Sequence, residues 1–114
     1  MYSNDEIMQF AYIIVEVADP DRIILFGSYA YGNPDVKSDI DLLVIKNGRN
    51  FTVADEAKLA TDVFYKRLKR GIRTRCDVFY RTDEQVIESA ENGGAFVDAL
   101  QKGRVIYERA YQSV

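Results

Sequence analysis

Two short apolar runs joined by a turn restrict the fold of this 114-residue chain more than any other feature. The first run, residues 22–26, follows Asp-Pro-Asp and stops at Gly27. The second, residues 40–45, is rich in aliphatic and β-branched side chains. Short runs of this composition predict buried strands. Because the second run is apolar on both faces, it predicts a central strand of a sheet covered on both sides.

Two acids, Asp39 and Asp41, stand at the start of the second run. Side chains alternate between the faces of a strand, so acids two residues apart project to the same side. Ionised groups beside an apolar strand cost free energy unless a cation compensates them. Mg²⁺ prefers carboxylate oxygens and keeps water or substrate phosphates as its other ligands. We therefore expect Asp39 and Asp41 to bind Mg²⁺ together with a nucleotide.

The turn between the two strands offers groups that suit a phosphate. Gly27 allows close approach of the backbone to a ligand, and Ser28 offers a hydroxyl and an N–H at the start of a short helix. Gly-Ser turns are also common without any ligand, so a tight turn with a helix cap is the ordinary alternative. Lys37 and Ser38, in the loop that follows, are further candidates for contacts with the triphosphate, although a loop lysine is usually just solvated.

A third acid, Asp77, lies in another predicted strand, residues 74–80, where it shares a face with Arg75 and Phe79. If this strand lies beside that of the acid pair, three carboxylates meet. Such a cluster can hold one metal ion on a triphosphate and a second on the attacking oxygen, for in-line displacement at the α-phosphorus. The alternative is an ion pair between Asp77 and Arg75 or Arg73.

Together these residues resemble the signature of the DNA polymerase β nucleotidyltransferase superfamily. The signature is carried by Gly27-Ser28, ten intervening residues, the Asp39-x-Asp41 pair and the later strand acid Asp77. The chain is particularly similar to the minimal nucleotidyltransferase (MNT) proteins, which include little beyond the catalytic core and are often paired with a helical HEPN protein. The resemblance extends from about residue 19 to residue 107.

The resemblance implies an α/β fold with a polymerase β-type core, a mixed β-sheet flanked by helices, in a single domain over residues 1–114. It implies a Mg²⁺-dependent enzyme that transfers AMP from ATP to a tyrosine of a HEPN toxin, and so acts as an antitoxin. Two Mg²⁺ ions, nucleoside triphosphate as substrate and a HEPN-type partner follow from it. The site it implies has catalytic and metal-binding acids (Asp39, Asp41, Asp77) and nucleotide-binding residues (Gly27, Ser28, Tyr31, Lys37, Ser38).

One position departs from the family pattern. Many relatives carry Gly-Ser-x-Ala-Arg-Gly, whereas this chain has Tyr31 where they have arginine. Tyr31 can stack on a base or bond a phosphate, but it cannot neutralise charge as a guanidinium does. A nucleotide-binding antitoxin without catalysis is therefore one alternative. Modification of a small molecule or an RNA end is another.

Composition narrows these options. The absence of histidine excludes Ser-His triads and histidine acid–base chemistry. The formal net charge of −3 argues against general binding to nucleic acid. A chain of this size has no room for a separate acceptor-binding domain, so a partner protein or a second copy of the chain must supply the acceptor. Cys76 is the only cysteine, and no apolar stretch approaches a membrane span; we expect a reducing, cytoplasmic location.

Helix signals complete an α/β order. Ser3 and Glu6 have capping-box spacing ahead of a first helix that ends near Asp19. Thr52 begins a second helix, for which we predict an apolar face of residues 53, 57, 60, 64 and 68 and an end at Gly71. A capped helix after Thr82 and a short last helix follow, and residues 105–107 form a short strand or an exposed tail. Six basic residues and no acid lie between positions 66 and 75, where they can bind phosphates or an acidic partner, or simply complement a helix end.

Overall fold

Helices and strands follow one another in the computed structural model in the α/β order that the sequence predicts. The model describes residues 1–94 and 96–110; position 95 and residues 111–114, which the single-domain prediction includes, lie outside the described residues. The elements are α1 (Asn4–Ala18), β1 (Arg22–Phe26), α2 (Ser28–Tyr31), β2 (Ile40–Ile45), α3 (Val53–Lys69), β3 (Cys76–Arg81), α4 (Asp83–Glu91), α5 (Val97–Lys102) and β4 (Arg104–Glu108).

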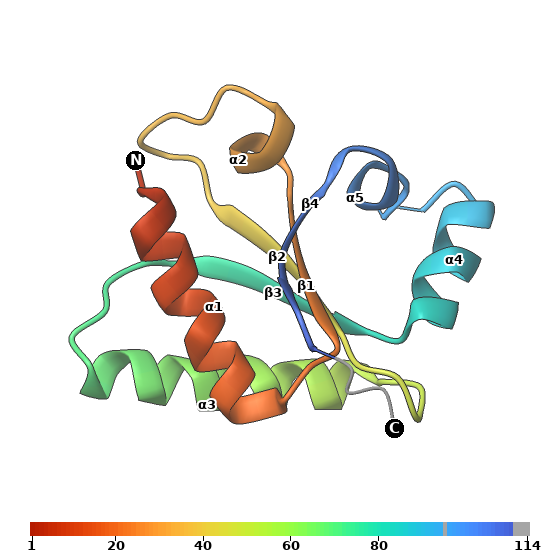
Figure 1. Cartoon of the computed structure of the whole chain (residues 1–114), viewed down its shortest axis with the longest axis horizontal. Helices are drawn as coiled ribbons and strands as arrows, with labels where there is room; N and C mark the ends of the chain where they lie inside the picture. The colour runs from red at the N-terminus through yellow and green to blue at the C-terminus, as the bar shows by residue number, and fades with distance from the viewer. Residues whose placement is uncertain (95, 111–114) are drawn as a thin grey trace.

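The four strands form one mixed sheet in the order β3-β2-β1-β4 (Figure 1). Strand β1 is antiparallel to both β2 and β4, whereas β2 and β3 are parallel. The antiparallel pair needs only the loop that contains α2, and the parallel pair is joined by the longer crossover through α3. The predicted motif strands are therefore the two central strands, and residues 105–107, predicted as a short strand or an exposed tail, lie in strand β4.

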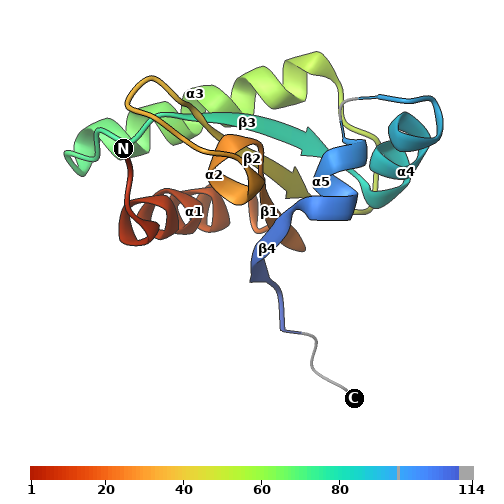
Figure 2. The same ribbon diagram turned by 90° about the horizontal axis from the view of Figure 1, so that it is seen from above.

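The two faces of the sheet bury separate apolar cores. Helices α1 and α3 cover one face, where the core includes Ile14, Leu25, Leu42 and Val63. Helices α4 and α5 lie against the other face, where Leu43 and Ile45 of β2 pack with side chains of both helices. Figure 2 shows these layers from above, with α3 running alongside β3. Because successive side chains of β2 enter different cores, the strand is apolar on both faces, as predicted.

Local capping signals determine where the helices begin. Ser3, Thr52 and Thr82 each accept a hydrogen bond from the backbone three residues later, and each helix has the reciprocal capping-box bond. Helix α1 ends at Asp19, which adopts a left-handed conformation with φ of 47°. In the described part of the chain, no helix is both long enough and apolar enough to cross a membrane.

The apolar face predicted for α3 is not the face that packs against the sheet. Val53 and Leu68 are 86% and 53% exposed, whereas Leu59 and Val63 are 4% and 1% exposed and face the sheet. The reason is a polar contact: Glu56, on the same side of the helix as Leu59 and Val63, accepts a hydrogen bond from the backbone N–H of Tyr80 in β3 at 2.8 Å. The orientation of α3 therefore buries the side with Leu59 and Val63 and leaves the predicted apolar face exposed.

Candidate functional site

Three carboxylates meet at one end of the two parallel strands. The register places Asp41 of β2 directly opposite Asp77 of β3, and Asp39 precedes β2 by one residue. Directly opposite residues have side chains on the same face of a sheet. Phe79, two residues beyond Asp77, belongs to the core under α4 and α5, so the acids project from that face of the sheet. Asp39 and Asp77 are exposed, and Asp41 is half-buried.

Mutual repulsion is built into this acidic end. Burial, followed by the charges of Asp77 and Asp39, raises the pKa of Asp41 above its usual value of 3.8. Among the ion pairs of residues 1–94 and 96–110, none includes any of these three acids. The alternative pairing of Asp77 with Arg73 or Arg75 is therefore not formed.

The donor set suits a hard cation. Carboxylate oxygens are the ligands that Mg²⁺ prefers, and a cation beside Asp41 would offset the burial and the repulsion that together raise the pKa of this group. The side chains are not gathered into a finished coordination shell: the described residues hold no group of three or more acidic, histidine or cysteine side chains that is ready to bind a metal ion. Ligands from a substrate would have to complete the shell, as is usual for Mg²⁺.

The Gly27 turn lies against the Asp41 carboxylate. Gly27 has φ of 75°, and a Cβ at this position would lie 2.2 Å from Oδ2 of Asp41. Only glycine combines this conformation with such a close approach. The carbonyl of Gly27 accepts hydrogen bonds from the N–H groups of Ala30 and Tyr31, which fold the one-turn helix α2. The turn and the acid pair, ten residues apart in the sequence, are thus one structural unit.

A lysine that the sequence analysis did not single out lies close to this turn. Lys102, in the last turn of α5, places its Nζ 5.9 Å from the centre of the Tyr31 ring. Tyr31 itself is 40% exposed. The neighbouring Tyr29 has a structural contact instead, because its hydroxyl accepts a hydrogen bond from the backbone of Tyr2 at 3.1 Å. No local sequence signal connects positions 31 and 102; only the packing of α5 on β1 brings them together.

The two loop candidates for triphosphate binding lie in a turn of their own. Asp35 accepts a hydrogen bond from the backbone N–H of Lys37 at 2.8 Å, and the Ser38 hydroxyl accepts one from the backbone N–H of Asp35 at 2.9 Å. Lys37 is exposed. The structure therefore gives Ser38 a local role in the loop, and the hydrogen bonds of the described residues include none between Lys37 or Ser38 and the Gly27 turn.

The basic cluster between residues 66 and 75 divides into two parts. Lys66 and Arg70 form ion pairs with Glu16 of α1 at 3.3 and 2.5 Å and lower the pKa of that carboxyl, so they help to hold α3 against α1. Arg73 and Arg75 are exposed, and neither forms an ion pair with any residue of the described ranges.

Burial disfavours the thiolate form of the single cysteine. Cys76, in β3, packs against the core under α1 and α3. Burial and the neighbouring Asp77 raise the pKa of its thiol, which disfavours the nucleophilic thiolate. The prediction that Cys76 acts as a small hydrophobic residue agrees with this position.

Comparison with solved structures supports the fold. A candidate nucleotidyltransferase from Sulfolobus solfataricus has a TM-score of 0.59 and 17% identity, with 92% of this chain and 79% of that chain covered. A toxin–antitoxin complex with AMP-PNP has a TM-score of 0.55 and 18% identity, with coverage of 95% and 75%. A mutant of the MntA–HpeT toxin–antitoxin pair has a TM-score of 0.51 and 18% identity, with coverage of 96% and 75%.

Comparison of the sequence with other proteins gives the family. No curated protein matches the chain. The sequence model of the nucleotidyltransferase domain, however, matches residues 7–106, a span that includes the Gly27 turn and all three acids. The mixed sheet flanked by helices agrees with this match. The chain therefore belongs to the nucleotidyltransferase domain family.

Proposed function

We propose that this chain is a Mg²⁺-dependent nucleotidyltransferase that transfers AMP from ATP to a hydroxyl of a partner protein. The observation that carries the proposal is the register that sets Asp41 opposite Asp77, with the Gly27 turn against the Asp41 carboxylate. Three acids that form no ion pair within the described residues, beside a glycine turn, suit a metal-bound triphosphate. Membership of the family supports nucleotidyl transfer as the reaction class.

The proposed partner is a HEPN-type toxin, and the proposed acceptor is a tyrosine hydroxyl, so that the chain acts as an antitoxin. The likeness in fold to two toxin–antitoxin structures, one of which holds AMP-PNP, supports this choice.

Each group has a distinct proposed role. Gly27 and Ser28 bind the triphosphate, while Asp39, Asp41 and Asp77 hold Mg²⁺, which supplies charge neutralisation at the phosphates. The acceptor oxygen forms a bond to the α-phosphorus as the bond from this phosphorus to the α–β bridging oxygen breaks, and pyrophosphate leaves. The acceptor proton passes to the Asp77 carboxylate, the exposed acid on the edge strand.

A second candidate function is an antitoxin that binds its partner and a nucleotide without catalysis. The observation that favours it is Tyr31, which replaces the arginine of many relatives and carries no positive charge. Masking of the toxin that persists when both Asp39 and Asp41 are changed to asparagine would support this function. Loss of masking with unchanged affinity for the partner would support catalysis.

The direct test of transfer uses ATP labelled at the α-phosphate. The purified chain, Mg²⁺ and a lysate of its source cells are incubated and separated under denaturing conditions, beside the Asp39→Asn/Asp41→Asn variant. We expect a labelled protein band only with the unchanged chain. If no labelled band forms with ATP or with the other nucleoside triphosphates, transfer to a protein is rejected.

A further inference from the structure

Strand β3 is an edge of the sheet, and part of this edge is open. Among the strands of residues 1–94 and 96–110, it pairs with β2 alone. Near its end, the backbone of Tyr80 faces away from β2, because its N–H donates to Glu56 Oε2 at 2.8 Å and its carbonyl accepts from Arg81 Nη1 at 2.7 Å. Two side chains thus occupy the outward backbone groups at this point.

The alternating direction of backbone N–H and C=O groups shows which other residues of β3 face outward. Backbone groups of a strand point to alternate sides at successive residues, so those of Val78 and Cys76 face outward like those of Tyr80. Within the residues that the structure describes, no hydrogen bond is recorded to the backbone of either residue from outside the sheet. The open edge is therefore a short segment, Cys76–Val78, centred on Asp77 and closed at Tyr80.

A groove runs along this open edge, with exposed apolar residues of α3 on its other side. Phe64 and Arg67 line one cavity of about 270 Å³, and Val53 and Ala57 line another of about 360 Å³. The two adjoin, because both are lined by the same four residues, Ala60, Cys76, Asp77 and Val78. The predicted apolar face of α3 thus forms one wall of a groove that passes Asp77.

The geometry of a sheet specifies what would happen if a strand were added here. A residue opposite Asp77 would have its side chain on the same face as Asp77 and Asp41, because directly opposite residues share a face. Its two neighbours would point to the other face, where Cys76 and Val78 pack beneath α3. An added strand would therefore place one side chain at the acids and the next ones against the exposed stripe of α3.

We propose that the acceptor is presented by an extended segment of the partner, which pairs with Cys76–Val78 as a short fifth strand. The acceptor tyrosine lies opposite Asp77, its apolar neighbours contact Ala60 and Phe64, and its hydroxyl loses its proton to Asp77 as its oxygen bonds to the α-phosphorus and pyrophosphate leaves. This inference rests on the proposed transfer to a protein hydroxyl. Main-chain pairing would supply affinity, and the alternating side chains would supply specificity.

The charge of the groove adds a requirement for the segment. At the end near Arg67, the groove continues into a cavity of about 490 Å³ that Arg73 and Arg75 also line. These two arginines have no acidic partner in the described part of the chain. We therefore expect an acidic residue in the segment, two or three positions from the tyrosine, because Arg75 lies two residues from Asp77 along the chain.

Two synthetic peptides test the strand pairing. The first is Ac-Val-Val-Tyr-Val-Asp-Asp-amide, and the second is the same peptide with three backbone nitrogens methylated, those of the tyrosine and of the valine on each side of it. Methylation keeps every side chain but removes the donors that a strand needs. With α-labelled ATP and Mg²⁺, we expect at least tenfold less label on the methylated peptide. Equal labelling of the two peptides would overturn the inference.

A matched pair of protein variants tests the groove. Ala60→Arg fills it, whereas Ala54→Arg places the same side chain on α3 outside it; both alanines are exposed. We expect Ala60→Arg to raise KM for the peptide at least tenfold, Ala54→Arg to change it less than twofold, and both to keep the affinity for ATP. An unchanged KM in Ala60→Arg would contradict the inference. Val78→Pro, which removes one outward N–H and is tolerated best on an edge strand, should act like Ala60→Arg.

The outcomes separate this inference from the proposed function. If a lysate protein is labelled but neither peptide is, and Ala60→Arg labels that protein as well as the unchanged chain does, transfer is established and the edge-strand inference fails. If the unchanged chain labels no acceptor of any kind, the proposed function itself fails.

Discussion

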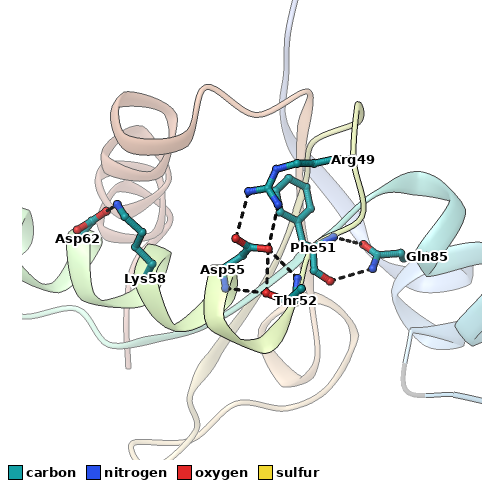
Figure 3. Close-up of polar contacts among 7 residues, drawn as sticks. All are labelled: Arg49, Phe51, Thr52, Asp55, Lys58, Asp62 and Gln85. Atoms are coloured by element: carbon teal, nitrogen blue, oxygen red, sulfur yellow. Dashed lines mark hydrogen bonds and ion pairs between the residues drawn. The ribbon is translucent and has the colours of Figure 1, made fainter.

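The two ends of the sheet differ in whether their acidic side chains have partners. At the end away from the Gly27 turn, acids have partners: Arg49 bonds both oxygens of Asp55 at 3.1 and 3.2 Å, and Asp55 also accepts from the backbone of Thr52 at 2.8 Å (Figure 3). Gln85 of α4 both donates to and accepts from the backbone of Phe51. This paired end secures the starts of α3 and α4 to the loop that follows β2.

At the acidic end, the same sheet brings three carboxylates together, and none of them forms an ion pair with a residue of the described ranges. Burial and the neighbouring acids raise the pKa of Asp41, whereas Arg49 and Thr52 lower the pKa of Asp55 to about 2. The fold thus disfavours the charged form of Asp41 and favours the charged form of Asp55. The comparison indicates that the paired end stabilises the structure and that the acidic end is arranged for a ligand that brings positive charge.

The largest expected effect comes from neutralising the acidic end. Asp41→Asn should lower transfer by about 10³-fold or more, because a metal-binding carboxylate supplies several kcal/mol of transition-state stabilisation. It should also raise the Tm at pH 7 by a degree or two, because the ionised Asp41 is disfavoured in the folded state. The stability gain should shrink as the pH falls through the raised pKa of Asp41 toward 3.8, where the carboxyl becomes neutral.

Label transfer and thermal melting at several pH values measure both effects. Glu91→Gln, an exposed change at the end of α4, is the control for removal of one negative charge. Retained transfer in Asp41→Asn would contradict the proposed site. A lower Tm of Asp41→Asn at pH 7 would contradict the prediction that burial and the neighbouring acids destabilise the ionised Asp41.

A change in the turn should affect both stability and transfer. Gly27→Ala would place a Cβ 2.2 Å from Asp41 Oδ2 at φ of 75°, so we expect a loss of about 1–3 kcal/mol in unfolding free energy and a loss of transfer of at least about tenfold. Gly71→Ala is a close control, because Gly71 has φ of 66° but no atom within 4 Å of the added Cβ. Chemical denaturation measures the unfolding free energy, and label transfer measures the activity. The excess effect of Gly27→Ala over Gly71→Ala reports the clash with Asp41, because both variants have the backbone strain. Equal effects of the two variants would argue against a role for the contact with Asp41.

At the paired end, we expect an effect on stability alone. Asp55→Asn should lower the Tm at pH 7 by a few degrees, because it removes the ion pair with Arg49 and weakens the helix cap. Because the pKa of Asp55 is lowered from 3.8 to about 2, its stabilisation is present above about pH 4 and is lost as the pH falls through about 2. The difference in Tm between the two proteins should therefore close between these pH values. A loss of ATP binding in this variant would show that the two ends are not independent.

Local signals predicted the parts of this fold that depend on local chemistry. The caps at Ser3, Thr52 and Thr82 are confirmed, because a hydroxyl and an acceptor three residues apart satisfy each other wherever the helix lies. The two central strands are also confirmed, since their apolar runs have no other way to be buried. Given those strands, the meeting of Asp41 and Asp77 required only that β3 lie parallel beside β2.

Features that depend on tertiary packing were not predictable. The face of α3 that is buried follows from the reach of Glu56 to the backbone of Tyr80, a contact between elements that no periodicity encodes. The predicted apolar face of α3 does consist of apolar residues, but no sequence pattern places it at the groove beside β3. The approach of Lys102 to Tyr31 likewise depends on where α5 packs.

The smallest expected effect concerns this lysine and sharpens the comparison at the acidic end. Lys102 is a cation near the turn where many relatives have an arginine, and its Nζ lies 5.9 Å from the centre of the Tyr31 ring. An exposed charge of this kind contributes about 0.5–1 kcal/mol, so Lys102→Met should raise KM for ATP about two- to fivefold with little change in kcat. Lys102→Arg should keep the affinity of the unchanged chain, and added salt should reduce the difference between the chain and Lys102→Met. If KM for ATP does not change, the turn binds the triphosphate without help from α5, and only the metal ion offsets the charge of the nucleotide at this end of the sheet.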